Sequence, residues 1–167
     1  TMVTPEGLIQ HFPFQTRAMT SSPDGYLWIS TMGNGLIKFD PEQGILEKYT
    51  TKDGLCSDVI YGMEKVNGNY LWLGTNNGLS RFNLENKEFT NYYESDGLLN
   101  NQFNYTATEK CAHNTLAFGG KKGIDFVYLS HLLENEYIPP VVLTDIRIFN
   151  KNVPVSKDSD SPALLKN

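Results

Sequence analysis

The sequence predicts an all-β protein with about three four-stranded antiparallel blades of a partial β-propeller, followed by a C-terminal exit strand. Three observations predict this fold class. A motif recurs about every 44 residues, the apolar residues of each repeat form short runs with a period of two, and turn dipeptides close those runs. Four antiparallel strands in a repeat of this length are typical of one propeller blade.

The repeat is visible in three segments of the chain. DGYLWISTMGNGLIKFD recurs as GNYLWLGTNNGLSRFN and, more loosely, as NTLAFGGKKGIDFV, at residues 24–40, 68–83 and 114–127. Trp28 and Trp72 are 44 residues apart, and the register drifts by only one or two residues, which is the size of a turn variation. We therefore expect blades at about 14–50, 58–93 and 103–130.

Turn residues mark the ends of the predicted strands. Asn34-Gly35 and Asn77-Gly78 supply the positive φ angles that tight hairpin turns require. An Asp-Gly-Leu landmark follows the first two repeats, at 53–55 and 96–98. No window longer than ten residues has a convincing helical pattern, and the nearest, 129–135, allows one short turn of helix. In the middle repeat we expect four strands, at about 58–66, 70–75, 78–83 and 87–93.

The aromatic residues that recur at the repeat spacing are expected to form the core between adjacent blades. They are Trp28, Trp72, Phe39, Phe82, Tyr49 and Tyr92. Closed propellers have about four to eight blades. Three blades would leave two unpaired sheet edges, which soluble proteins avoid. We therefore expect the chain to be an excerpt of a larger propeller, or its missing blades to come from elsewhere.

Composition excludes several classes of function. The 167 residues carry a formal net charge of -5, so the chain lacks the basic stripe that neutralises phosphates, and we expect no nucleic-acid partner. No apolar run reaches eighteen residues, so we expect no membrane contact by this segment. Cys56 and Cys111 belong to no Cys-x-x-Cys motif or Cys/His cluster, and we expect both to be buried small hydrophobic residues.

Alignment of the repeats places Arg17, Tyr61 and, roughly, Thr106 at equivalent early positions of the innermost strand, with Asn104 and Tyr105 nearby. The innermost strands of a propeller feed the loops around its central axis. An arginine, tyrosine rings and an amide facing a wet cleft suit a carbohydrate, because rings stack on sugars and the guanidinium donates forked hydrogen bonds. We therefore predict a ligand site at Arg17, Tyr61, Asn104 and Tyr105. The alternative, that these side chains only plug the axis, stays open.

Catalytic and metal-binding patterns are missing from the sequence. His11, His113 and His131 are isolated, and no nucleophile elbow or phosphate-binding glycine loop is present. Glu64 and Glu109 stand at matching repeat positions, which indicates a shared structural role rather than an acid/base pair. We predict no catalytic residue, no metal and no cofactor in this segment.

Two longer patterns carry a resemblance to a known family. DG-x-LW-[IL]-x-T-x-x-GL-x-x-F-[DN], followed by Y-x-x-x-DGL, resembles the regulator-propeller repeat of periplasmic sensors in hybrid two-component histidine kinases typical of Bacteroides and its relatives. FGGKKGIDF (118–126) and YIPPVVLTDIRIFNKNVPV (137–155) resemble the last blade of such sensors running into the tyrosine-rich β-sandwich that follows it. Ala117 and Val127 depart from the pattern, because bulkier residues are usual at those positions.

The resemblance implies a domain division and a role. It implies a partial propeller over 1–136, then a linker and the first strand of a truncated β-sandwich over 137–167. It implies a non-catalytic, periplasmic segment that senses a small molecule, an oligosaccharide, for a kinase outside this chain. Its partners would be the remaining blades, the β-sandwich and a second receptor in a homodimer. Two alternatives stay open: a propeller enzyme acting on glycans as a hydrolase or lyase, and a protein-interaction scaffold.

Overall fold

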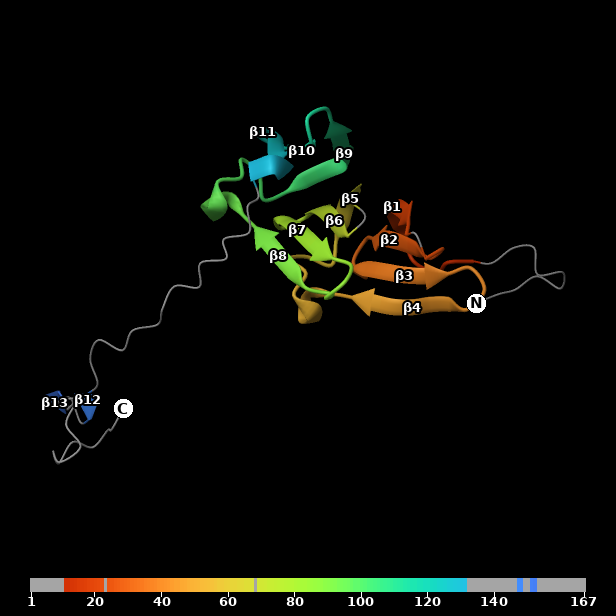
Figure 1. Ribbon diagram of the computed structural model, residues 1–167, viewed down its shortest axis with the longest axis horizontal. Coiled ribbons are helices and arrows are strands. Elements are labelled where there is room, and N and C mark those ends of the chain that lie inside the picture. Colours follow the sequence, from red (N-terminus) through yellow and green to blue (C-terminus); the bar gives the residue numbers. More distant parts are fainter. Residues whose placement is uncertain (1–10, 23, 68, 132–146, 149–150, 153–167) are drawn as a thin grey trace. The chain divides into compact units, whose positions relative to one another are not determined.

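The computed structural model describes residues 11–22, 24–67, 69–131, 147–148 and 151–152. Three antiparallel sheets follow one another along the chain (Figure 1). The first sheet contains β1 (Thr16–Ser21), β2 (Leu27–Thr31), β3 (Leu36–Asp40) and β4 (Gly44–Tyr49). The second contains β5 (Ile60–Val66), β6 (Tyr70–Thr75), β7 (Leu79–Asn83) and β8 (Phe89–Tyr92). The third contains β9 (Phe103–Cys111), β10 (Thr115–Gly120) and β11 (Gly123–Tyr128).

A buried threonine closes the central hairpin of the first two sheets. Thr31 donates its hydroxyl proton to Gly35 O (2.7 Å) and accepts from the Asn34 amide (3.0 Å). Thr75 does the same with Gly78 O (2.7 Å) and the Asn77 amide. Because both turns place glycine at positive φ, a side chain there would be strained. The repeated Thr-x-x-x-Gly and Thr-x-x-Gly spacings therefore build the same turn.

The Asp-Gly-Leu landmark forms a short capped turn that leads into the next sheet. Asp53 ends the 3₁₀ turn η1 (Thr51–Asp53) and accepts a hydrogen bond from the Thr50 amide (2.8 Å). Asp96 ends η2 (Glu94–Asp96) and accepts from the Tyr93 amide (2.9 Å) in the same way. The following glycine has left-handed φ in both cases, which only glycine adopts without cost. Each landmark thus redirects the chain from one sheet to the next.

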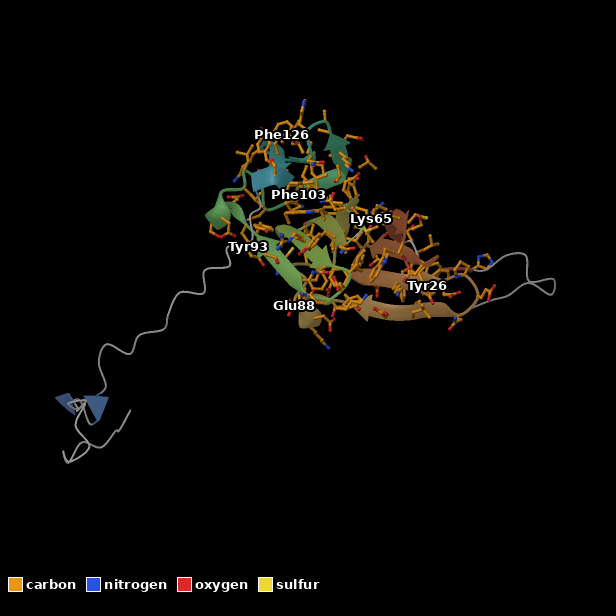
Figure 2. All side chains as sticks on the ribbon, viewed as in Figure 1. Tyr26, Lys65, Glu88, Tyr93, Phe103 and Phe126 are labelled. Carbon is orange, nitrogen blue, oxygen red and sulfur yellow. The ribbon has the colours of Figure 1, made fainter. Side chains whose placement is uncertain are left out.

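Two apolar clusters form the core, one between each pair of consecutive sheets. Trp28 of the first sheet and Phe82 of the second meet with ring centroids 5.5 Å apart, and both are fully buried. Phe103 and Phe118 fill the space between the second and third sheets together with Trp72. Figure 2 shows Phe103 in this position. Inter-sheet packing of the repeated aromatics is confirmed for these residues, whereas Phe39 faces the other side of the first sheet and packs on Phe12.

The prediction of an all-β fold with antiparallel sheets is confirmed, and the arrangement is compatible with consecutive propeller blades. Predicted strands of the middle repeat differ from β5–β8 by at most two residues at either end. The third sheet differs from the expected four strands, since it has three among the described residues. The expected helical turn occurs as η3 (Leu129–His131). None of the helices in the described segments is long and apolar enough to cross a membrane.

The chain divides into two compact units, Thr1–Leu132 and Leu133–Asn167. In the second unit, β12 (Arg147–Ile148) and β13 (Lys151–Asn152) form a two-stranded antiparallel ladder. The predicted exit strand belongs to 137–167, and of that range the structure describes only 147–148 and 151–152. The boundary at 136 and the β-sandwich assignment stay predictions.

Candidate functional site

The innermost strands of the three sheets lie next to one another and bring three of the four predicted site residues together. β5 contacts both β1 and β9, and Figure 1 shows the three strands in succession. The guanidinium carbon of Arg17 lies 4.4 Å from the ring centroid of Tyr105. The rings of Tyr61 and Tyr105 meet edge to face, with centroids 4.6 Å apart. We call Arg17, Tyr61 and Tyr105 the inner-strand cluster.

Each innermost strand has an irregular register at the position of its cluster residue. Between two successive positions that pair with the neighbouring strand, the innermost strand has more residues than that neighbour. At least one residue of the innermost strand is therefore unpaired. Such bulges bend a strand and re-aim a side chain, and they are enriched beside functional sites. The shifts lie between Thr16 and Met19 on β1, between Ile60 and Gly62 on β5, and between Phe103 and Thr108 on β9.

The bulge in β9 contains an unusual backbone conformation. Thr106 follows Tyr105 and has φ 53, although threonine is β-branched. This left-handed conformation costs on the order of 1–3 kcal/mol for such a residue, and strained positions of this kind cluster at functional sites. Thr106 also holds the repeat position of Tyr61 and Arg17. The strain therefore lies where Tyr105 is turned toward the cluster.

Two amide side chains join the cluster at its rim. The Tyr61 hydroxyl donates to Asn76 Oδ1 (3.1 Å), and Gln102 Nε2 donates to the same oxygen (2.8 Å). Asn76 comes from the β6–β7 turn, and Gln102 comes from the residues just before β9. The pair of hydrogen bonds fixes the orientation of the Asn76 amide, and its NH₂ group remains a donor.

The cluster is buried at Tyr61 and accessible to solvent at Tyr105. Tyr61 is 9% exposed, whereas Tyr105 is 51% exposed. Arg17 is half-buried, and its Nε is a buried donor that has no hydrogen-bond partner among the described residues. Buried donors in folded proteins are nearly always paired. The arrangement therefore offers a cation, two aromatic rings and an unused donor within one small area.

The structure brings Arg17, Tyr61 and Tyr105 together, and Asn104 lies apart from them. Asn104 is exposed on β9, but no contact in the described part of the chain joins it to the cluster. Asn76 and Gln102 were not predicted, because Asn76 belongs to an Asn-Asn-Gly turn that the sequence explains by turn chemistry alone. The signal that could have identified them is their place beside the innermost strands in the repeat alignment.

Other chemically active side chains lie apart from the cluster. Burial raises the pKa of the Glu64 carboxyl, and repulsion from Glu109 adds to the shift while Lys110 opposes it. Cys56 and Cys111 are half-buried and free, rather than buried as expected. Within the described ranges, no three His, Cys, Asp or Glu residues are grouped so that they could hold a metal ion.

Contacts with two hydroxyl groups hold the Cys56 thiol in its half-buried position. Its sulfur lies 2.9 Å from Ser80 Oγ and 3.2 Å from Thr75 Oγ1. Burial raises its pKa, and the two hydroxyls partly offset that shift. The thiol is therefore held in its neutral form, which is a poor nucleophile.

Comparison with known proteins finds a similar histidine kinase sequence and similar solved extracellular domains. No protein-family model matches the chain. Over 88 residues, 53% of this chain, it is 39% identical to histidine kinase P4 of Formosa agariphila, and the matched stretch is 6% of that protein. Two solved extracellular domains of hybrid two-component systems from B. thetaiotaomicron also match. One has a TM-score of 0.52 and 21% identity and covers 92% of this chain and 19% of that domain. The other has a TM-score of 0.46 and 19% identity and covers 89% and 28%.

The likeness to the first of these domains supports the fold alone. The solved neighbours are extracellular domains, and the matching sequence is a histidine kinase. This chain spans well under a third of each of those proteins.

Proposed function

We propose that the chain is part of the periplasmic ligand-sensing region of a hybrid two-component receptor, that its sheets are consecutive propeller blades, and that its inner-strand cluster binds an oligosaccharide. The observation that carries the proposal is the meeting of Arg17, Tyr61 and Tyr105 from three separate sheets. A cation and two tyrosines that meet at the innermost strands are residue types enriched in recognition surfaces.

The chemistry of the cluster suits a sugar. A half-exposed tyrosine ring offers an apolar face to the C–H groups of a pyranose, and its hydroxyl stays hydrated. Arg17 offers donors in a fixed plane to neighbouring sugar hydroxyls or to a carboxylate. The rim amide of Asn76 offers further donors.

The same geometry suggests how binding could be transmitted. Because the cluster draws one side chain from each sheet, a ligand that contacts all three would favour the arrangement in which the sheets are held closest together. A ligand shifts a conformational equilibrium only through its different affinity for the two states. In the parent receptor, the shift would pass to the β-sandwich, to the second subunit of a homodimer and to the kinase.

The two rival functions require features that can be tested separately. An enzyme would need acid and base side chains beside the bound sugar, and the carboxylates Glu64 and Glu109 lie on the innermost strands but outside the cluster. A protein-interaction scaffold would bind through the outer rim and would be indifferent to sugars. The cluster favours the sensor over both.

The experiment is a thermal-shift screen of the chain against neutral and acidic oligosaccharides. A ligand at one hundred times its Kd stabilises a folded protein by about 2.7 kcal/mol, which raises Tm by several degrees. We expect one sugar family to raise Tm and the Arg17→Ala variant to lose that shift. Arg81→Ala is the matched control, because Arg81 also covers a tyrosine ring, Tyr70, but lies on β7 away from the cluster. An unchanged Tm with every oligosaccharide, or a Tm shift that persists in Arg17→Ala, would contradict the proposal.

A further inference from the structure

Arg17 carries a positive charge that no acidic side chain of the described residues neutralises. Its guanidinium contacts the Tyr105 ring at 4.4 Å, and none of the ion pairs formed within the described ranges includes it. Lys38, Lys87 and Lys122, by contrast, each pair with a carboxylate. The chain contains 19 acidic and 14 basic residues, so acidic partners are not scarce. An arginine that lies apart from them is available to an acidic ligand.

The donors of Arg17 that reach solvent are its two terminal nitrogens. Nε is the one side-chain nitrogen or oxygen of the described residues that is buried without a hydrogen-bond partner. Nη1 and Nη2 also have no partner in this part of the chain, so neither of them is buried. A ligand therefore meets Arg17 at its Nη1/Nη2 edge. This edge presents two parallel N–H groups, and a carboxylate accepts from both with its two oxygens.

Tyr105 covers one side of the guanidinium, and an insertion in β9 carries it there. Between successive paired positions, β9 has four residues, 104–107, opposite Gly119. At the corresponding place, β1 has two residues, 17–18, opposite Ser30. The bulge of β9 is therefore longer by two residues, and Tyr105 lies within it. Because the ring blocks one side of Arg17, an anion would approach along the Nη1/Nη2 edge and lie beside the exposed part of the ring.

The surroundings of Arg17 supply no competing carboxylate. The rim consists of the neutral amides of Asn76 and Gln102. The carboxylate of Glu64, on β5, is repelled by the Glu109 charge and lies outside the cluster. The formal net charge of -5 disfavours anions at long range, so an acidic ligand would gain from contact with Arg17 itself rather than from the general field of the protein.

We propose that the ligand of the inner-strand cluster is an acidic oligosaccharide, and that a uronate carboxylate binds the Nη1/Nη2 edge of Arg17 while the sugar ring packs on Tyr105. This inference rests on the proposed function, because it names the class of sugar that the same site takes. Arg17 then determines the specificity for an acidic over a neutral sugar, whereas the tyrosine rings contribute to the binding of both. Hydrogen bonds between charged groups are about twice as strong as neutral ones, which gives the preference its size.

The test compares oligosaccharides that differ in their acidic groups alone. Oligogalacturonate, oligoglucuronate and oligomannuronate are each paired with the neutral oligosaccharide obtained by reduction of their carboxyl groups. Isothermal titration calorimetry measures the Kd of each member for the chain. We expect at least one uronate to bind about tenfold or more tightly than its reduced partner, because the reduced sugar loses the charged pair with Arg17.

The outcomes separate this inference from the proposed function. A reduced sugar that binds as tightly as its uronate would overturn the acidic ligand and leave the proposed sugar sensor standing. If neither the acidic nor the neutral sugars bind, both fall. A sulfated neutral oligosaccharide that binds as tightly as the uronate would overturn the carboxylate, since charge alone would then suffice.

Two variants distinguish the charge of Arg17 from its two parallel donors. Arg17→Gln keeps hydrogen-bond donors without the charge and should reduce the preference for the uronate to within about twofold. Arg17→Lys keeps the charge without the parallel donors and should retain about threefold. Arg81→Gln is the matched control on β7 and should keep the full preference. An unchanged preference in Arg17→Gln would overturn the proposal.

A signal from the wild-type chain makes the test independent of how the variants fold. The sequence contains three arginines, Arg17, Arg81 and Arg147. In the ¹⁵N-arginine-labelled chain, the guanidinium resonances of Arg17 should shift saturably with the uronate and much less with its reduced partner. Those of Arg81 should stay unmoved. Uronate binding that leaves the Arg17 resonances unmoved would overturn the proposal.

Discussion

Gly62 on β5 lies so close to Thr108 on β9 that a β-carbon at position 62 would overlap the Thr108 hydroxyl oxygen. The two residues belong to different sheets, and Gly62 follows Tyr61 directly. The missing side chain therefore lets the innermost strands approach each other, and this approach brings Tyr61 within reach of Tyr105.

Gly62→Ala should destabilise the chain by about 1–3 kcal/mol, because the added methyl group overpacks a buried contact. Urea unfolding measures the change. Thr108→Ala removes the atom that would be overlapped, so the double variant should recover part of the loss. Strictly additive effects of the two substitutions would contradict the close packing of β5 on β9.

Much of the fold could be predicted because a repeat carries its structure in every copy. The spacing of Trp28 and Trp72, the turn glycines and the Asp-Gly-Leu landmark each correspond to one recurring element. The third sheet was less predictable, because its pattern is worn and Ala117 and Val127 replace larger residues. The sequence also could not show which positions bulge, since a bulge depends on pairing with the neighbouring strand rather than on local composition.

Ser80→Ala should lower the free energy of unfolding by about 1–3 kcal/mol. Ser80 is fully buried, and its hydroxyl accepts from the Cys56 amide (3.2 Å) and donates to Asn91 (2.6 Å). Removing it leaves buried groups without partners, which costs their desolvation. Chemical denaturation followed by tryptophan fluorescence measures the loss. Thr90→Ala, on the exposed side of β8, is the control and should change stability by less than about 0.5 kcal/mol.

Glu64→Gln should make the chain slightly more stable at pH 7. Burial and the Glu109 charge raise the pKa of Glu64, so the folded state binds its proton more readily than the unfolded state. Stability linked to this group is fully present below the ordinary carboxyl pKa of 4.5 and is lost as pH rises through the raised value. Because solvent screens the group, the gain should stay below about 1 kcal/mol.

Thermal unfolding between pH 4 and pH 8 distinguishes the loss of the Glu64 charge from an effect of the substitution on stability that does not depend on pH. The curves of wild type and Glu64→Gln should converge at the acid end and separate as the carboxyl ionises. Glu42→Gln, at an exposed turn, should follow the wild type throughout. A constant offset between wild type and Glu64→Gln at every pH would contradict the assigned electrostatic cause.

The candidate site was partly predictable from alignment of the repeats. Arg17 and Tyr61 occupy equivalent positions, and the structure brings both to Tyr105. The left-handed conformation of Thr106 lies beyond any sequence rule, because threonine seldom adopts it. Asn104 was predicted from proximity in sequence, but alternate strand residues point to opposite faces, so a neighbour of Tyr105 need not share its surroundings.

The most direct test of the central claim is NMR of the tyrosine rings while an oligosaccharide panel is titrated into the ¹³C-tyrosine-labelled chain. Tyr26 and Tyr70 are internal controls, because each also lies under a cation, Lys38 or Arg81, but outside the cluster. We predict saturable shifts of Tyr61 and Tyr105 with one sugar family, and none at Tyr26 or Tyr70. Unmoved Tyr61 and Tyr105 resonances in the folded chain across the whole panel would contradict a sugar-binding cluster.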